Sequence, residues 1–297
     1  TRFWHNQKVV PENRYTYDTL YQLVSATGRE MANAGQQRSS LPDISPFDKA
    51  SYTNYTRNYI YDRAGNMTQI RHSAPKTGNN HTTDITVSQR SNRAVLKTLA
   101  DTPEKAEALF TPGGQQTQLQ PGQTLSWTAC GELQQVMPVV RNGAAGDRES
   151  YRYDAGSQRI LKTTVQETGS RTQTQQVIYL PGLELYRGKE NYQVICAGVA
   201  GRAQVRLLHW PDGKKDHQRF SYGNLIGSSG LETDGDGKLL SQEEYYPFGG
   251  TAVLVADADS GIDYKTHRYS GKERDATGLY YYGYRYYQPW AGRWLSS

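Results

Sequence analysis

Residues that could carry acid–base, nucleophilic or metal chemistry are few and scattered in this chain. The six histidines include no close pair at metal-ligand spacing: His5, His72, His81, His209, His217 and His267. Because zinc needs clustered ligands, we expect no metal site and no cofactor. Cys130 and Cys196 stand sixty-six residues apart without a CxxC motif, which favours free thiols over a structural disulfide.

Two short motifs resemble a calcium-binding loop and a nucleophile elbow, but neither has the residues or spacing that such a site needs. Asp234-Gly235-Asp236-Gly237 lacks the third oxygen position and the distal glutamate of a calcium loop, so a D-G hairpin turn is preferred. Gly227-Ser228-Ser229-Gly230 fails the G-x-S-x-G spacing of a nucleophile elbow.

The densest chemistry lies in Tyr264–Ser297, where eight tyrosines and two tryptophans occur within thirty-four residues, interleaved with Arg, Lys and Gly. Aromatic runs punctuated by glycine exclude a helix face, and disordered tails lack aromatics, so we expect tight turns joining short strands. Such rings could stack on sugars or single-stranded nucleic acid, but a packed plug is favoured because rings on turns usually fill cores. The predicted plug includes Tyr282, Tyr286, Trp290 and Trp294.

The carboxylates nearest to these aromatic residues are Asp263 and Asp275. The run D-A-T-G has good turn chemistry. We therefore expect Asp275 to cap a turn or to pair with Arg268, Arg274 or Lys272.

The elements that must position these residues follow a repeated pattern, Y-x-Y-D, then a small turn, then an alternating strand. Its three clear copies contain Tyr15, Tyr17 and Asp18; Tyr59, Tyr61 and Asp62; and Tyr151, Tyr153 and Asp154. Degraded copies occur at Phe220–Gly223 and Arg268–Gly271.

Each copy predicts a β-hairpin. The two tyrosines point to one face of a strand, the aspartate accepts from turn amides, and glycine (Gly28, Gly65 or Gly156) supplies the positive φ of the reversal. One hairpin cannot bury its own face, so stacked copies are needed. The pattern predicts an all-β protein whose hairpins form an extended, curving sheet.

Composition agrees with this fold class and excludes others. Hydrophobic residues make up 36% of the 297 residues, yet Tyr is 23 and Phe only 5. A net charge of +5 without blocks of like charge gives no indication of nucleic-acid binding. No run of 18 apolar residues occurs, so no membrane insertion is expected.

Outside the repeats, three features stand out. Thr102–Phe110 predicts a short helix with Thr102 as N-cap, and Val177–Tyr186 predicts one strand. A weak seam lies near Arg141–Arg148.

At this point the residues resemble a known family. The Y-x-Y-D units resemble YD repeats of the Rhs type, and SQEEYYPFGG followed by RYSGKERDATGLYYYGYRYYQPWAGRWLSS resembles the Rhs-associated core segment. FWHNQKVVPENRYTYDTLYQLVSATGREMAN, YGNLIGSSGLE and EEYYPFGGTAV resemble the C component (TccC type) of insecticidal Tc toxins. The resemblance divides the chain into a repeat shell region at 1–240 and a closing segment at 241–297.

The resemblance implies a spiralling sheet that forms part of a hollow shell. In that family the B and C components enclose a cytotoxic C-terminal effector, which the A component translocates. The effector is released by aspartyl-protease-like self-cleavage that needs two aspartates in D-P-x-G motifs and one arginine in Y-x-R-Y-Y. Arg285 matches that arginine, while both aspartates are expected beyond Ser297.

Three hypotheses follow. The first is a structural shell fragment of a secreted toxin complex, with the B component as partner, its own effector as cargo and the A component as an indirect partner. The second is an autoproteolytic enzyme, which we expect of the longer parent chain and not of this one, because an arginine cannot replace two carboxylates that share a proton. The third is a carbohydrate-binding YD-repeat module.

Overall fold

The computed structural model describes residues 2–4, 6–137, 147–168, 171–200 and 203–296. The predicted all-β class is confirmed, since antiparallel strands dominate these residues. The chain forms two compact units. Unit 1 comprises Thr1–Phe110, Gln242–Asp259 and Pro289–Arg293, and unit 2 comprises Thr111–Ser241, Ser260–Gln288 and Trp294–Ser297. Among the described residues, no helix has the length and apolar character needed to cross a membrane. The seam predicted near Arg141–Arg148 falls almost entirely outside these residues.

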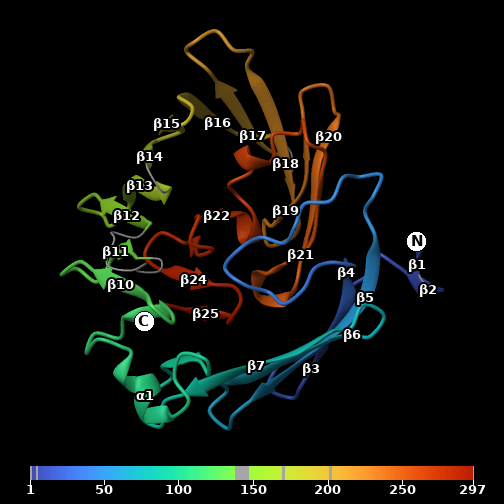
Figure 1. The fold of residues 1–297 in the computed structure, drawn as a ribbon, viewed down its shortest axis with the longest axis vertical. Coiled ribbons are helices and arrows are strands. Elements are labelled where there is room, and N and C mark those ends of the chain that lie inside the picture. Colours follow the sequence, from blue (N-terminus) through green and yellow to red (C-terminus); the bar gives the residue numbers. More distant parts are fainter. Residues whose placement is uncertain (1, 5, 138–146, 169–170, 201–202, 297) are drawn as a thin grey trace. The chain divides into compact units, whose positions relative to one another are not determined.

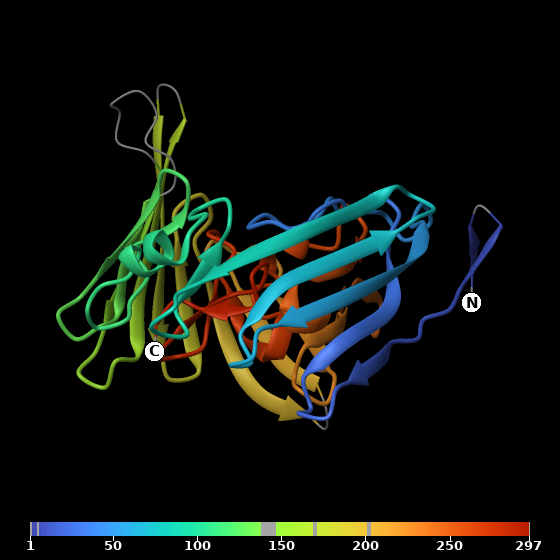
Figure 2. The same cartoon turned by 90° about the horizontal axis from the view of Figure 1, so that it is seen from below.

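Unit 1 is built around a six-stranded sheet in which β3 to β8 pair in chain order. Its long strands lie side by side with a marked twist (Figure 2). The sheet strands are β3 (Arg14–Tyr17), β4 (Leu23–Met31), β5 (Tyr52–Tyr61), β6 (Met67–Ala74), β7 (Asn79–Val87) and β8 (Ala94–Leu96). The unit also holds β1 (Arg2–Trp4), β2 (Gln7–Val9), the 3₁₀ turn η1 (Pro247–Gly249) and β21 (Thr251–Ala256).

The predicted helix is present as α1 (Pro103–Ala108). Thr102 accepts a hydrogen bond from the Lys105 amide, so it caps the helix as predicted.

Unit 2 contains consecutive antiparallel strands from β9 to β19 (Figure 1). They are β9 (Gln118–Gln120), β10 (Gln123–Trp127), β11 (Leu133–Val136), β12 (Arg148–Tyr153), β13 (Arg159–Thr168), β14 (Arg171–Leu180), β15 (Leu183–Arg187), β16 (Tyr192–Ala200), β17 (Ala203–His209), β18 (His217–Gly223) and β19 (Ser229–Thr233). Strand β20 (Leu239–Tyr245) begins in unit 2 and ends in unit 1. The single strand predicted at Val177–Tyr186 is wrong, because the chain turns at Pro181-Gly182 and forms β14 and β15.

One type of five-residue loop closes the hairpins of the Y-x-Y-D repeats. The amide of its first residue donates to the carbonyl of the fifth, and the amide of the fourth donates back to the first. At Asp18, Asp62 and Asp154 the carboxylate also accepts from the amides two and four residues on. The pairing register shifts just before these loops, as in hairpins that join a type I turn to a bulge.

The same loop recurs more widely than the Y-x-Y-D pattern indicates. Its backbone bonds are present at no fewer than ten positions, which begin at Asp18, Asp62, Thr111, Thr128, Asp154, Asn224, Asp234, Tyr246, Arg268 and Asp275. Asn224 and Asp234 also accept from the two turn amides. The hairpin turn predicted at Asp234–Gly237 is therefore confirmed.

The predicted role of glycine is wrong for two of the three clear repeats. The fourth loop residue has positive φ, and it is Gly65 in the second repeat but Tyr21 in the first and Ser157 in the third. Gly28 lies inside β4, where a Cβ would stand 2.9 Å from the Tyr55 hydroxyl. This glycine permits a close approach to a ring and does not make the turn.

Tyrosine hydroxyls join one hairpin to the hairpin before it. The Tyr61 hydroxyl donates to the Leu23 carbonyl at 2.8 Å, and the Tyr153 hydroxyl donates to the Leu133 carbonyl at 2.6 Å. Both acceptors stand five residues after the first residue of the preceding loop, Asp18 or Thr128. The second tyrosine of the repeat thus gives successive hairpins a fixed spacing.

The loop geometry predicts that one glycine substitution lowers the free energy of unfolding and that another leaves it almost unchanged. Gly65→Ala should lower the free energy of unfolding by about 1–2 kcal/mol, because alanine is strained at a φ of +83°. Gly156→Ala should change it by less than about 0.5 kcal/mol, since its φ is ordinary and a Cβ meets only Asp154 Oδ1 at 3.4 Å. Chemical denaturation of both variants measures the difference, and equal losses would contradict the assignment of the positive-φ position.

Candidate functional site

The aromatic C-terminal segment folds into short elements, as predicted for tight turns and short strands. Residues 260–288 pack within unit 2, whereas Pro289–Arg293 belong to unit 1. The elements are η2 (Ile262–Tyr264), η3 (Tyr269–Gly271), β22 (Glu273–Arg274), β23 (Tyr280–Tyr281), β24 (Tyr286–Gln288) and β25 (Arg293–Trp294).

Four buried charges hold this segment to the sheet of unit 2. Arg159 Nη1 lies 2.7 Å from Asp275 Oδ2, and Arg159 Nη2 lies 2.5 Å from Glu273 Oε2. Lys162 Nζ lies 2.5 Å from Glu273 Oε1 and 2.9 Å from Asp275 Oδ1. Each cation contacts both carboxylates, so the four side chains form a closed arrangement, which we call the charge square.

The charge square is stable as ions despite its burial. Burial alone would lower the pKa of Lys162, but Asp275 and Glu273 raise it well above its ordinary value. Burial would raise the pKa of Glu273, yet Lys162 and Arg159 hold it well below its usual range. The Tyr179 hydroxyl adds a hydrogen bond to Glu273 at 2.9 Å. Lys162 and Glu273 are therefore both charged at neutral pH.

The partners predicted for Asp275 are wrong. The aspartate does begin a hairpin loop, since its amide donates to Leu279 and its carbonyl accepts from Gly278. Its carboxylate, however, is 1% exposed and pairs with Arg159 and Lys162, more than a hundred residues away. Sequence reasoning missed both cations, because β13 pairs with its neighbours in sequence and nothing in that pairing points to Asp275.

The structure brings together part of the predicted plug, since the Tyr282 and Trp294 rings meet edge to face at 4.8 Å. Tyr286 is 1% exposed and its hydroxyl lies 2.8 Å from that of Tyr153, so it packs on a repeat tyrosine. Tyr282 is half-buried, and Trp294 is 36% exposed. Trp290 is buried within unit 1, while the other three belong to unit 2.

Arg285 lies on the surface of unit 2 beside these rings. Its guanidinium carbon stands 4.1 Å above the Trp294 ring. Among the described residues, none is recorded as accepting a hydrogen bond from its guanidinium. The arginine is thus oriented by stacking, and its N–H groups remain available.

The repeat tyrosines differ in environment from copy to copy. Tyr59 and Tyr151 are 3% and 2% exposed, and Tyr61 and Tyr153 make the inter-hairpin bonds described above. Tyr15 and Tyr17, on β3 at the edge of its sheet, are 49% and 56% exposed.

A second buried polar network lies in unit 1. Arg57 Nε donates to His72 Nδ1 at 3.0 Å, so the ring proton is on His72 Nε2, which lies 3.0 Å from Glu30. Asn79 and the Tyr246 hydroxyl also donate to Glu30. His81, opposite His72 across the β6–β7 pair, stacks on its ring at 4.6 Å. The strand register places His72 opposite His81, although their spacing in the sequence did not indicate that they would be in contact. Within the described chain, no three His, Cys, Asp or Glu residues are grouped to hold a metal ion.

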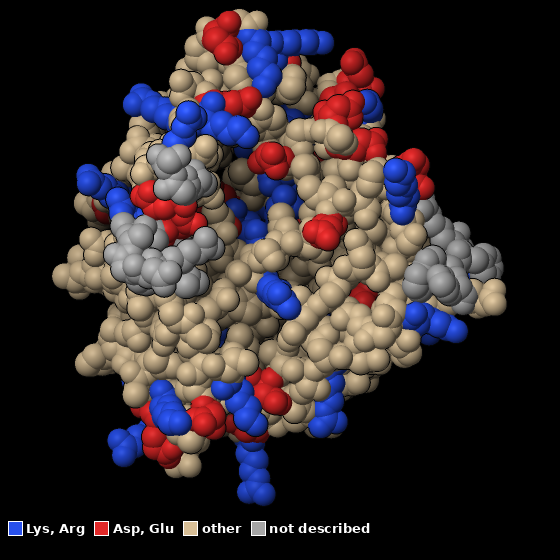
Figure 3. Space-filling view, in the orientation of Figure 1, with Lys and Arg blue, Asp and Glu red and all other residues tan. Residues whose placement is uncertain are grey.

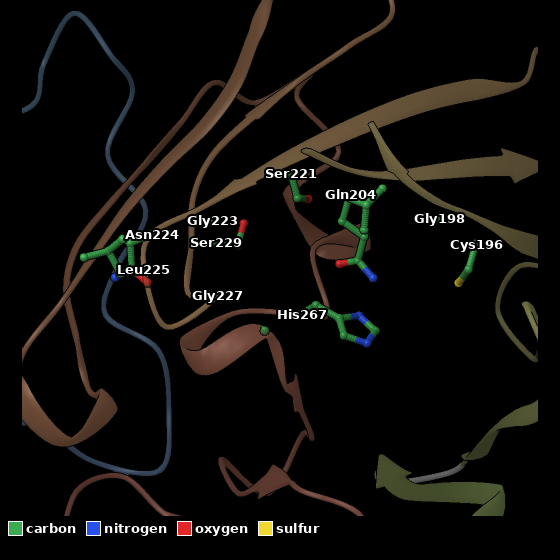
Figure 4. A pocket seen from close by; sticks show the side chains of 12 residues that line it. Cys196, Gly198, Gln204, Ser221, Gly223, Asn224, Leu225, Gly227, Ser229 and His267 are labelled. Atoms are coloured by element: carbon green, nitrogen blue, oxygen red, sulfur yellow. The ribbon is translucent and has the colours of Figure 1, made fainter. Parts of the chain in front are cut away.

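A cavity of about 510 Å³ in unit 2 holds the two side chains most typical of nucleophilic catalysis (Figure 4). His267 and Cys196 line it together with Gln204, Ser221 and several glycines. Burial lowers the pKa of His267, and burial and Glu184 raise the pKa of Cys196. A neutral imidazole and a protonated thiol 4.0 Å from a carboxylate do not form an activated nucleophile.

Charges on the molecular face shown in Figure 3 are intermingled, with acidic and basic side chains interspersed over an otherwise uncharged surface. This agrees with the dispersed charge of the sequence and gives no single-sign patch on that face.

The repeated five-residue loop and the tyrosine-linked hairpins define a YD-repeat protein, and the charge square holds its aromatic C-terminal segment to the sheet of unit 2. Comparison with known proteins makes this specific. The family described as Tripartite Tc toxins repeat matches residues 78–122. Toxin subunits YenC1 and YenC2 of Yersinia entomophaga are each 60% identical over the whole chain. The resemblance to Tc-toxin C components is thereby confirmed.

Solved structures give the same result. A crystal structure of TcdB2-TccC3 matches with a TM-score of 0.93 at 60% identity, over 100% of this chain and 15% of that chain. The Photorhabdus luminescens Tc holotoxin pore with mutation TccC3-D651A matches with a TM-score of 0.93 at 59% identity, over 100% of this chain and 14% of that chain. The chain spans about a third, 32%, of the length of the curated relatives it matches.

The charge square predicts a large penalty for removing one of its members. Asp275→Asn should lower the free energy of unfolding by about 3–5 kcal/mol, because Arg159 and Lys162 would keep one carboxylate between them. Asp101→Asn is the matched control, since the Asp101–Lys105 pair is exposed to solvent and its loss should leave the denaturation midpoint almost unchanged. Equal denaturation midpoints for the two variants would contradict the anchoring role.

His81 predicts that acid destabilises unit 1. Burial, with further lowering by His72 and Arg57, reduces the pKa of His81 from 6.5 to about 4. The unfolded chain therefore binds a proton between pH 6.5 and pH 4 that the folded chain does not, and the free energy of unfolding should fall as pH falls through this window. Because His81 is half-exposed, the loss should be well below the roughly 3 kcal/mol of a fully buried group. Denaturation from pH 7 to pH 4 should show a flatter curve for His81→Gln, and an unchanged slope would contradict this origin.

Proposed function

We propose that the chain is part of the shell of a Tc-toxin C component, which with a B component encloses a cytotoxic C-terminal effector for translocation by an A component. The observation that carries the proposal is the match of the whole chain, with a TM-score of 0.93, to part of a crystal structure of TcdB2-TccC3. The hairpin architecture supports it, because loops closed by local bonds and hairpins linked by tyrosines extend a sheet without a large apolar core. The assembly is proposed to act outside the bacterium as a secreted toxin.

Residues 1–240 are proposed as repeat shell and residues 241–297 as the closing segment. The charge square supports this division in unit 2, since it ties Glu273 and Asp275 of the closing segment to Arg159 and Lys162 of the repeats. The closing segment is thereby held in one register, as expected of an element that ends an array.

Arg285 is proposed to support self-cleavage in a longer chain that supplies two aspartates after Ser297. Its stacking on Trp294 supports this role, because the ring fixes the guanidinium plane and leaves donors for a carboxylate or a developing oxyanion. An arginine cannot act as the proton-sharing carboxylate pair of such chemistry, so the chain as it stands is proposed to cleave nothing.

Co-expression tests the two parts of the proposal separately. A chain extended through both aspartates should co-purify with the B component and release a C-terminal fragment visible on a denaturing gel. Arg285→Ala should still co-purify but lose cleavage by at least about 100-fold, as when one stabilising donor is removed. The control is Arg152→Ala, an exposed arginine of β12 that should leave both properties unchanged. Failure to co-purify would contradict the shell role, and normal cleavage by Arg285→Ala would contradict only the role of the arginine.

A further inference from the structure

A second cavity in unit 2, of about 540 Å³, is lined by residues of strands β12 to β16. Its floor and walls come from these strands, and residues Gly261–Thr266 and Ala276 of the closing segment complete it. Its volume is that of an ordinary small-molecule site. Nothing in the proposed shell role requires it.

Cross-strand register arranges the lining in two rows. Glu149, Thr164 and Gln175 stand opposite one another on β12, β13 and β14. The second row runs from Lys162 through Val177 to Tyr186 and Tyr192. Because neighbouring strands lie about 4.8 Å apart, Glu149 and Tyr192 are separated by roughly 19 Å across the sheet. The cavity therefore fits an extended ligand with different chemistry at its two ends.

At one end of the cavity lies Glu149, a carboxyl group without a salt-bridge partner in the described part of the chain. The two cations of the charge square are balanced by Glu273 and Asp275. Glu149 is a further carboxyl group, which the charges of Asp275 and Lys162 influence. Glu149 is 2% exposed and accepts hydrogen bonds from the Tyr151 and Thr164 hydroxyls. It forms no salt bridge with any residue that the structure describes. A buried carboxylate without a salt bridge is stabilised when it pairs with a cation or takes up a proton.

The aromatic end is suited to the body of an organic cation. The Tyr186 and Tyr192 rings are stacked at 4.4 Å with 8° between their planes, and Tyr264 meets Tyr192 edge to face at 5.3 Å. Tyrosine faces attract ammonium groups and cover hydrocarbon chains.

We propose that this cavity binds an extended alkylammonium ligand, whose ammonium group pairs with Glu149 and whose chain lies along Tyr186 and Tyr192. The ammonium group comes either from a free polyamine or from a lysine side chain of a polypeptide. Both sources present the same chemistry to the carboxylate: three N–H donors and one positive charge on a flexible stem.

Binding is linked to the proton on Glu149. Burial and the charge of Asp275 raise the pKa of Glu149, against the opposing effect of Lys162, and Tyr151 is the other titratable group that faces it. Because the carboxyl group must be ionised to pair with an ammonium group, binding releases a proton whenever Glu149 is protonated. Affinity therefore rises as pH rises through the pKa of Glu149.

Titration calorimetry with matched probes tests the proposal on the assembled protein. 1,10-Decanediamine, which is long enough to reach from Glu149 toward the tyrosines, should bind, whereas 1,10-decanediol, of the same length but uncharged, should not. Glu149→Gln should weaken diamine binding roughly ten- to hundredfold, the loss expected for a charged hydrogen bond. It should also abolish proton release, measured in two buffers of different ionisation enthalpy. Glu167→Gln, the same change at an exposed site on β13, is the matched control and should behave as the parent protein.

A second variant keeps the proposal testable if Glu149→Gln fails to fold. The Gln175 side chain is exposed and belongs to the same row as Glu149, so Gln175→Lys should place a tethered ammonium group in the cavity and abolish diamine binding. Thr174→Lys, on the opposite face of β14, should not. Parallel titrations with spermidine and with a lysine-bearing peptide distinguish the two sources. Equal binding of diol and diamine, or full diamine affinity in Glu149→Gln or Gln175→Lys, would overturn the proposal.

Discussion

The ion pairs between strand β13 and the closing segment are the interaction on which unit 2 depends. Arg159 and Lys162 are taken from water on the covered face of a sheet, which costs several kcal/mol per ion unless each is matched. Glu273 and Asp275 form ion pairs with both cations only when their segment is docked in a single register, because each carboxylate must reach Arg159 and Lys162. Such pairs add little net stability over an apolar contact, but they penalise every other register strongly. The charge square therefore specifies where the segment docks.

The same preference for polar packing explains the composition. A chain with 36% hydrophobic residues and 23 tyrosines cannot fill two units with aliphatic cores, and its buried apolar clusters are small. Tyrosine provides ring area and a hydroxyl, and the hydroxyl is used: Tyr61 and Tyr153 bond to carbonyls of the preceding hairpin. Arg219 with Glu232 in unit 2, and Arg57 with His72 in unit 1, extend the pattern of buried but paired polar groups.

Local chemistry determined how much the sequence could predict. The hairpins were predictable because the loop closes within five residues, and Asp62 caps amides only two and four positions away. The position of positive φ was not, because Tyr21 and Ser157 adopt a conformation that sequence reasoning reserves for glycine. The partners of Asp275 were unpredictable for a different reason. Turn chemistry correctly predicts the backbone conformation at Asp275, but its carboxylate pairs with Arg159 and Lys162, which only the fold brings near. His72 and His81 likewise meet only through strand register.

A sheet built in this way has a consequence for the proposed shell role. An apolar face would hold an unfolded polypeptide by non-specific hydrophobic contact and would oppose its release. The face of β12 to β16 offers paired ions, hydroxyls and amides, and its apolar surface consists mainly of Val177 and tyrosine rings. Such a face contacts a chain weakly except where a charge is left without a counter-ion, and Glu149 is that exception among the charges grouped around the square. Contact that is concentrated at one carboxyl group can be released by protonation of that group, whereas contact spread over an apolar surface cannot be released in this way.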